Sequence, residues 1–184
     1  KYYIEAGDTF LIEAGTPHAI GAGCLLVEIQ EPSDLTIRME KTSPSGLELE
    51  EYLIDQGIGY EKMFDLFNYK GLTWEETLQK WQVAPATLTE SMDGREIELI
   101  GYKQTPYFRM TLLEVENEMM IKADGVFSGL YILSGTAAIL IDSDTQTVQK
   151  GDQLFVPAQV SSLTIKNTGH GELKVLRLFG PEVD

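Results

Sequence analysis

Residues 7–20 read GDTFLIEAGTPHAI and residues 151–165 read GDQLFVPAQVSSLTI, and the two stretches follow one pattern. Each begins with Gly-Asp, continues with four residues typical of a strand, and then reaches an alanine, Ala14 or Ala158, at the same place. The pattern predicts one structural element that is used twice. His18 of the first copy aligns with Ser162 of the second, so any chemistry that needs an imidazole belongs to the first copy.

Short runs rich in β-branched and aromatic residues surround both copies. Before residue 40 they are TFLI, CLLVEI and LTIRM, separated by Ala-Gly, Gly-Ala-Gly and Glu-Pro-Ser-Asp turns. From residue 97 onward they are ELIGY, FRMTLLEV, GLYILSG, TAAILID, QLFVPA, LTIK and LKVLRLFG. Asp142 and Asp144 between two of these runs are typical hairpin-turn residues. Strands divided by turns at this spacing predict a sandwich or a barrel.

The segment between the two β-rich parts is predicted to be helical. Apolar residues recur at helical spacing at Tyr60, Met63, Phe64 and Phe67. Thr73 and Glu76 form a capping box that opens a helix around WEETLQKW. The aromatic and methionine side chains here, Trp74 and Trp81 included, are expected to be core contacts of helices packed on a sheet.

The first copy resembles the second conserved motif of cupins: glycine, five residues, proline, one residue, glycine, two residues, histidine. Only Glu13, at the proline position, departs from it, whereas the second copy keeps Pro157 but lacks the glycine and histidine. Residues 15–40, GTPHAIGAGCLLVEIQEPSDLTIRME, look like the segment of type I mannose-6-phosphate isomerases that carries a Gly-Thr-x-His-Ala zinc histidine, then Glu-Ile-Gln, Ser-Asp and an arginine.

The resemblance implies a mostly β protein built from cupin-type jelly-roll barrels, one partial and one complete, with a short helical insert. We expect residues 1–45 to be the C-terminal part of an incomplete barrel that carries the motif histidine. Residues 46–90 would be the helical insert. Residues 91–184 would be a second cupin-like domain without metal ligands.

The activity implied by the resemblance is a zinc-dependent aldose–ketose isomerase that interconverts mannose 6-phosphate and fructose 6-phosphate. His18 would bind zinc, and the other ligands of the family, a glutamine, a histidine and a glutamate, would come from a cupin motif upstream of Lys1. The chain is therefore expected to be the C-terminal part of a longer isomerase and inactive alone. By the same resemblance Arg38 would stabilise the enediolate or the sugar oxygens, and Glu28 would line the pocket and handle protons.

The residues themselves leave alternatives open. Glu28, Gln30, Thr36 and Arg38 alternate with apolar neighbours, so a hairpin would gather them on one face. That face fits a barrel lumen, and it fits the solvent side of an antiparallel sheet equally well. His18 in a turn is also compatible with a surface position, and His170 is expected to be exposed.

Charge and cysteine content narrow the class of protein. With 29 acidic and 14 basic side chains the net charge is −15, which argues against nucleic acids and anionic membranes as partners. An anionic sugar phosphate would need a local basic residue. The single cysteine, Cys24, lies in an apolar run, where a free cysteine is expected to be buried. It cannot form an internal disulfide, and no stretch of about 20 apolar residues or signal peptide is present, so a cytoplasmic location is expected.

Two rivals to the isomerase follow from the same residues. One is a non-catalytic sugar-binding or regulatory cupin, and the other is a structural jelly-roll domain whose polar face is simply hydrated. The oligomeric state is left open.

Overall fold

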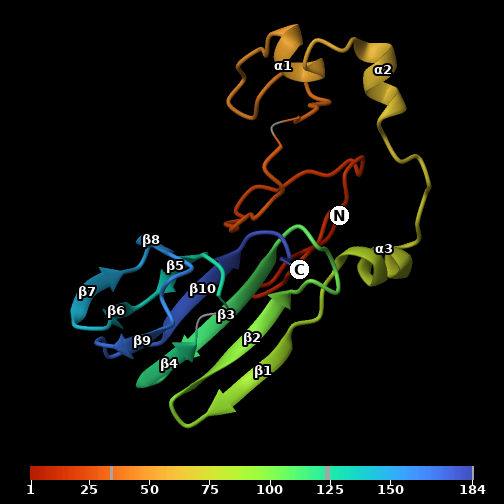
Figure 1. Ribbon diagram of the computed structural model, residues 1–184. Helices are drawn as coiled ribbons and strands as arrows, with labels where there is room; N and C mark the ends of the chain where they lie inside the picture. Colours follow the sequence, from red (N-terminus) through yellow and green to blue (C-terminus); the bar gives the residue numbers. More distant parts are fainter. Residues whose placement is uncertain (34, 123–124, 184) are drawn as a thin grey trace. The chain divides into compact units, whose positions relative to one another are not determined.

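A computed structural model describes residues 1–33, 35–122 and 125–183, which form two compact units (Figure 1). The N-terminal unit comprises Lys1–Ile4 and Phe10–Trp81, and the β-unit comprises Glu5–Thr9 and Gln82–Asp184. The longer segment of the β-unit, Gln82–Asp184, includes residues 91–184, where the second cupin was predicted; the predicted domain boundaries stay predictions.

The β-unit contains two antiparallel sheets, drawn from green to blue in Figure 1. The strands are β1 (Ala86–Ser91), β2 (Gly94–Ile100), β3 (Arg109–Val115), β4 (Glu118–Lys122), β5 (Ser128–Ser134), β6 (Thr136–Ile141), β7 (Asp144–Gln149), β8 (Gln153–Val156), β9 (Ser162–Asn167) and β10 (Leu173–Phe179). The six-stranded sheet has the order β1-β2-β3-β10-β5-β8, and the four-stranded sheet has the order β4-β9-β6-β7. Because β10 lies between β3 and β5, the end of the chain is at the centre of the larger sheet.

The interior of the β-unit is apolar because buried and less buried residues alternate along its strands. Along β3 and β10, Leu113, Val115, Leu173 and Val175 are at most 3% exposed. They belong to one cluster together with side chains of both sheets, among them Ile139 and Ile165 of the smaller sheet. The predicted hairpin is confirmed: β6 and β7 pair up to Ile141 and Asp144, and Asp142 has a positive φ of 52°.

The two copies of the repeat begin with the same turn. In both Gly7-Asp8 and Gly151-Asp152 the aspartate carboxylate accepts a hydrogen bond from the backbone N–H three residues earlier, at 2.9 and 2.8 Å. The aspartate N–H donates to the carbonyl of that same earlier residue, at 3.1 and 3.0 Å. Both glycines have left-handed φ angles, 100° and 93°. The predicted use of one element twice is confirmed for this turn.

The N-terminal unit contains three short helices, α1 (Glu51–Asp55), α2 (Tyr60–Asp65) and α3 (Trp74–Trp81). The capping box of α3 is confirmed, since Glu76 N–H donates to Thr73 Oγ1 at 3.2 Å and Thr73 N–H donates to Glu76 Oε2 at 2.8 Å. The core prediction for this segment holds only in part, because Met63 is buried whereas Trp74 is 46% exposed. The longest helix has 8 residues, so among the described residues no helix could cross a membrane.

The strands predicted before residue 40 are not formed. Residues 1–33 and 35–45 contain no strand and only isolated bridge residues, such as Thr42, which pairs with Glu48. A strand needs a neighbouring strand for its N–H and C=O groups, and here the backbone N–H of Arg38 instead donates to the carbonyl of Ile54, at 2.9 Å. Leu25 and Leu35 of these runs are 90% and 81% exposed. Cys24, predicted to be buried, is exposed as well. The assignment of residues 1–45 to an incomplete barrel stays a prediction.

Candidate functional site

The turn that carries His18 lies in the N-terminal unit and is stabilised by residues of the helical segment. Asn68 N–H donates to the carbonyl of Gly15 at 2.8 Å, and Lys80 Nζ lies 2.6 Å from Glu13 Oε2. Gly15 has a φ of +76°, and a Cβ atom there would lie 2.7 Å from the carbonyl oxygen of Leu66. The motif glycine is therefore needed both for its backbone angle and for this close approach.

The imidazole of His18 has one nitrogen engaged. Nδ1 lies 2.9 Å from the carbonyl oxygen of Thr16, and since a carbonyl can only accept, Nδ1–H is the donor. In the neutral ring this leaves the lone pair of Nε2 for another partner. Metal-binding histidines commonly have one ring N–H bonded to a backbone carbonyl in this way. The side chain of His18 is exposed, which is the surface position that the sequence left open, and its role as a metal ligand stays a prediction.

Arg38 and Glu28 are not brought together by a hairpin, because neither lies in a strand. The guanidinium of Arg38 donates from Nη1 to the carbonyl of Leu53 at 3.0 Å, which places Arg38 beside α1. Glu28 is exposed. The predicted polar face of Glu28 and Arg38 therefore does not form in this structure, and their catalytic roles stay predictions.

A pocket of about 390 Å³ lies beside the His18 turn, within the N-terminal unit. It is lined by Thr16, Pro17, Asn68, Lys70, Leu72, Lys80 and Trp81. Two of these residues directly precede His18, and the others come from the segment that follows α2 and from the end of α3. No local periodicity marks Lys70, Lys80 or Trp81 as site residues, so the sequence analysis missed them. The only property of the sequence that could have pointed to these lysines was its acidic net charge, because an anionic substrate of such a protein needs a basic residue nearby.

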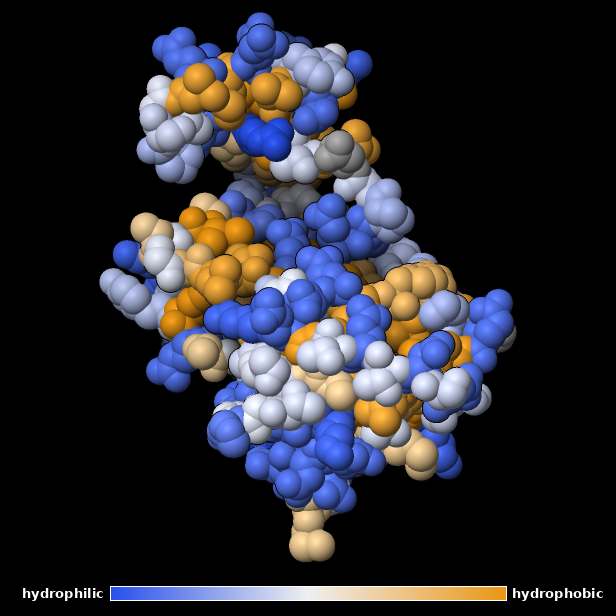
Figure 2. All heavy atoms as spheres, turned by 90° about the vertical axis from the view of Figure 1, so that its left-hand side faces the viewer, coloured by the Kyte–Doolittle hydropathy of each residue, from blue (hydrophilic) through white to orange (hydrophobic). Residues whose placement is uncertain are grey.

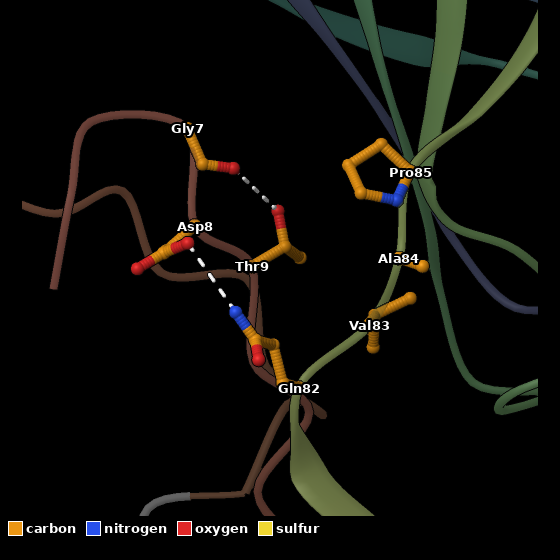
Figure 3. A pocket seen from close by; sticks show the side chains of 7 residues that line it. All are labelled: Gly7, Asp8, Thr9, Gln82, Val83, Ala84 and Pro85. Atoms are coloured by element: carbon orange, nitrogen blue, oxygen red, sulfur yellow. Dashed lines mark hydrogen bonds between the residues drawn. The ribbon is translucent and has the colours of Figure 1, made fainter. Parts of the chain in front are cut away.

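A second pocket, of about 290 Å³, lies in the β-unit beside the first copy of the repeated turn (Figure 3). Its walls are the Gly7–Thr9 turn and residues 82–85. The only ionisable side chain among them is Asp8, which accepts a hydrogen bond from Gln82 Nε2 at 3.3 Å. The Asp8 carboxylate stabilises the turn through these hydrogen bonds. Its negative charge would repel an anionic ligand.

A comparison with known proteins finds a family match within the β-unit. Residues 99–177, which run from the end of β2 to near the end of β10, match the family profile described as the mannose-6-phosphate isomerase cupin domain. The β-unit thus has the cupin fold and, over these residues, is similar to the cupin domain of mannose-6-phosphate isomerases. The predictions of family and of a mostly β cupin fold are therefore confirmed.

Similarity to individual proteins extends beyond this cupin domain. A mannose-6-phosphate isomerase of Streptococcus mutans is 23% identical over 166 residues, which are 88% of this chain and 46% of that protein. The chain thus spans about half the length of this relative. The crystal structure of the mannose 6-phosphate isomerase from Bacillus subtilis is similar with a TM-score of 0.55 at 15% identity, over 76% of this chain and 38% of that chain. At this identity the structural likeness shows the fold alone.

The cupin domain has a buried polar cluster among its inward-facing residues. Arg177, 3% exposed, donates from Nη1 to Glu96 Oε1 at 3.2 Å, and Thr111 Oγ1 donates to the same oxygen at 2.8 Å. The guanidinium carbons of Arg109 and Arg177 each lie 4.7 Å from the centre of the Phe179 ring. This cluster joins β2, β3 and β10 and contains no typical metal-ligand set.

A zinc ion does not fit the described residues as a complete site. A catalytic zinc usually has three protein ligands and one open position. His18 offers a suitable Nε2, yet within residues 1–33, 35–122 and 125–183 no three His, Cys, Asp or Glu side chains are grouped so that they could hold a metal ion. His18 could therefore supply one zinc ligand, and the described residues do not complete the set.

Proposed function

We propose that the protein acts as an aldose–ketose isomerase that interconverts mannose 6-phosphate and fructose 6-phosphate. The observation that carries the proposal is the His18 turn, which keeps the Nε2 lone pair of its imidazole available next to a pocket with two lysines. The family of the cupin domain and the relative that matches 88% of the chain support it. Because the chain spans about half of that relative, we assign the activity to the complete gene product and expect the 184-residue chain alone to be inactive.

The reaction moves one proton between C1 and C2 of the sugar. A base removes the proton from C2 of the aldose, and the electron pair forms the C1–C2 double bond of an enediolate with negative charge on O1. The proton returns to C1, the O2 proton passes to O1, and a ketose results. We assign the proton transfer at carbon to Glu28 and the stabilisation of the charged oxygens to Arg38. Arg38 uses one guanidinium N–H for Leu53 and has further donors for substrate oxygens.

Zinc dependence belongs to the same proposal, with His18 as one ligand. A bound zinc ion would supply positive charge near developing oxyanions. The described residues provide no complete ligand set. The other zinc ligands of this proposal would therefore come from residues other than those described, and the proton transfer at carbon and the stabilisation of the charged oxygens are assigned to Glu28 and Arg38 without the metal. The proposal also places the protein in the cytoplasm, where a single cysteine needs no disulfide partner.

An assay that couples fructose 6-phosphate formation to a detectable product tests the proposal on the complete gene product. We expect turnover that is lost on chelation and restored by zinc. His18→Ala should lower activity about 100-fold or more, because a metal ligand is removed. The matched control is His170→Ala, which alters the other, exposed histidine and should leave activity unchanged. Equal activity of the two variants would contradict the role of His18.

The rival reading is a sugar-binding cupin that performs no reaction. The cationic pocket with its tryptophan supports it, because such a pocket can bind a sugar phosphate without a metal. Saturable binding of mannose 6-phosphate by the complete gene product, with no turnover in the presence of zinc, would favour this reading over the isomerase.

A further inference from the structure

The pocket beside the His18 turn is cationic in an otherwise acidic protein. Its seven lining residues include Lys70 and Lys80 and no aspartate or glutamate, although the whole chain has a net charge of −15. We infer that this pocket binds the phosphate group of a phosphorylated monosaccharide through Lys70 and Lys80. The identity of the ligand as a sugar phosphate rests on the proposed function, and the cationic character of the pocket does not.

Lys80 is held in place before any ligand arrives. Its Nζ lies 2.6 Å from Glu13 Oε2 and 5.5 Å from the centre of the Trp81 ring, and 34% of its side chain is exposed. Contacts on two sides restrict the rotamers of a long side chain, which lowers the entropy lost when a ligand binds. Since Glu13 offsets part of its charge, Lys80 orients an anion more than it attracts one.

Lys70 supplies the uncompensated charge. It is exposed, and its backbone N–H donates to Asn68 Oδ1 at 3.0 Å. Across residues 1–33, 35–122 and 125–183 no carboxylate lies within ion-pair distance of its ammonium group. A phosphate oxygen in the pocket would therefore gain a charge-assisted hydrogen bond without breaking an existing ion pair.

The remaining walls suit a monosaccharide. Trp81 is half-buried and lines the pocket, so its flat ring offers apolar surface to a sugar. Leu72 and Pro17 add apolar surface. A volume of about 390 Å³ is at the small end of the roughly 300 to 1,000 Å³ typical of ligand pockets. Thr16 and Pro17 directly precede His18 in the chain, so a sugar phosphate held here would lie beside the His18 turn.

Tryptophan fluorescence reports directly on this pocket. The chain has two tryptophans, so in Trp74→Phe the emission comes from Trp81 alone. We expect a saturable change with mannose 6-phosphate, and a dissociation constant at least about tenfold higher for mannose and for inorganic phosphate, which each lack half of the contacts. Calorimetry on the chain with both tryptophans repeats the titration in case Trp74→Phe disturbs the fold. Inorganic phosphate binding as tightly as mannose 6-phosphate would overturn the assignment of a sugar.

Lys70→Gln should raise the dissociation constant of mannose 6-phosphate about tenfold or more, because one charge-assisted hydrogen bond is lost. Lys62→Gln, an equal change of charge on exposed Lys62 of α2 outside the pocket, should leave it unchanged. Circular dichroism establishes that both variants fold. Absent binding, or equal binding by both variants, would overturn the inference. Binding that depends on Lys70, together with a complete gene product that shows no turnover in the presence of zinc, would overturn the proposed function and uphold the inference.

Discussion

Arg177 places a buried guanidinium in the interior of the cupin domain. It is 3% exposed and shares Glu96 Oε1 with the Thr111 hydroxyl. Glu96 has only 13% of its side chain exposed. A buried ion pair contributes little beyond what well-packed apolar residues would, but removing one partner leaves a buried charge without compensation. The expected effect of mutation is therefore large even though the net value of the pair is small.

Arg177→Ala should lower the free energy of unfolding by about 3 to 5 kcal/mol, measured by denaturant unfolding of the chain. Lys166→Ala is the control, because Lys166 is 57% exposed and lies 3.9 Å from the equally exposed Glu118; it should cost about 1 kcal/mol or less. Similar losses in the two variants would show that the Arg177 pair is not buried as described.

Site residues divide into those that motif spacing could predict and those it could not. His18 and the glycine turns at Gly7 and Gly151 follow from local patterns, since each needs only nearby residues for its geometry. Lys70 and Lys80 meet the His18 turn through contacts between segments more than fifty positions apart, as between Asn68 and Gly15. Such contacts leave no period in the sequence, so spacing could not reveal this pocket.

Strands and helices were predictable to different degrees for a similar reason. The capping box of α3 and the β6–β7 hairpin are closed by neighbours in the chain, and both were predicted. The runs around Leu25 and Leu35 have strand composition, but a strand forms only when another strand satisfies its backbone. Composition thus indicates which residues can join a sheet, and only the partner decides whether they do.

The pairing of β2, β3 and β10 makes the cupin domain sensitive to acid. Glu114 of β3 lies opposite Arg95 of β2 and Lys174 of β10, forming an ion pair with Arg95 and lying 3.4 Å from Lys174 Nζ. Burial acts to raise the pKa of Glu114, but hydrogen bonds and charge from Arg95 and Lys174 outweigh it, and the pKa is lowered. A carboxyl with a lowered pKa stabilises the folded state above its unfolded pKa. That contribution is lost as the pH falls through the folded pKa.

Glu114→Gln should therefore destabilise the protein by about 1 kcal/mol at neutral pH, and the difference from the wild type should shrink as the pH falls below the ordinary carboxyl range of about 4. Unfolding free energies measured from pH 7 down to about pH 2 test this. The exposed Glu118→Gln variant should differ little from the wild type at any pH. A Glu114→Gln deficit that is constant with pH would rule out the ion pairs as its cause.

On the scale of the whole molecule, apolar burial is distributed very unequally between the two units. Among the described residues, 18 buried hydrophobic residues lie in the cupin domain and only Ile54 and Met63 lie in the N-terminal unit. Conversely, 16 of the exposed large hydrophobic residues belong to the N-terminal unit and 7 to the cupin domain. Apolar side chains at the surface appear in orange in Figure 2. Because burial of apolar area is the main stabilising term, the two units should differ strongly in stability.

The N-terminal unit should therefore unfold locally at a much lower free-energy cost than the cupin domain. In hydrogen exchange, amides of residues 10–81 should exchange at least about 100-fold faster than those of β3, β5 and β10, which reflects a difference of roughly 3 kcal/mol or more in opening free energy. Limited proteolysis with mass spectrometry should first cut within residues 10–81 and leave a resistant fragment that contains β1 to β10. Uniform protection across both units would mean that the apolar side chains exposed in this structure are buried in solution.

If mannose 6-phosphate slows exchange at residues 68–81 and not in β5, binding and order in the N-terminal unit are linked, because a ligand stabilises only the state that binds it.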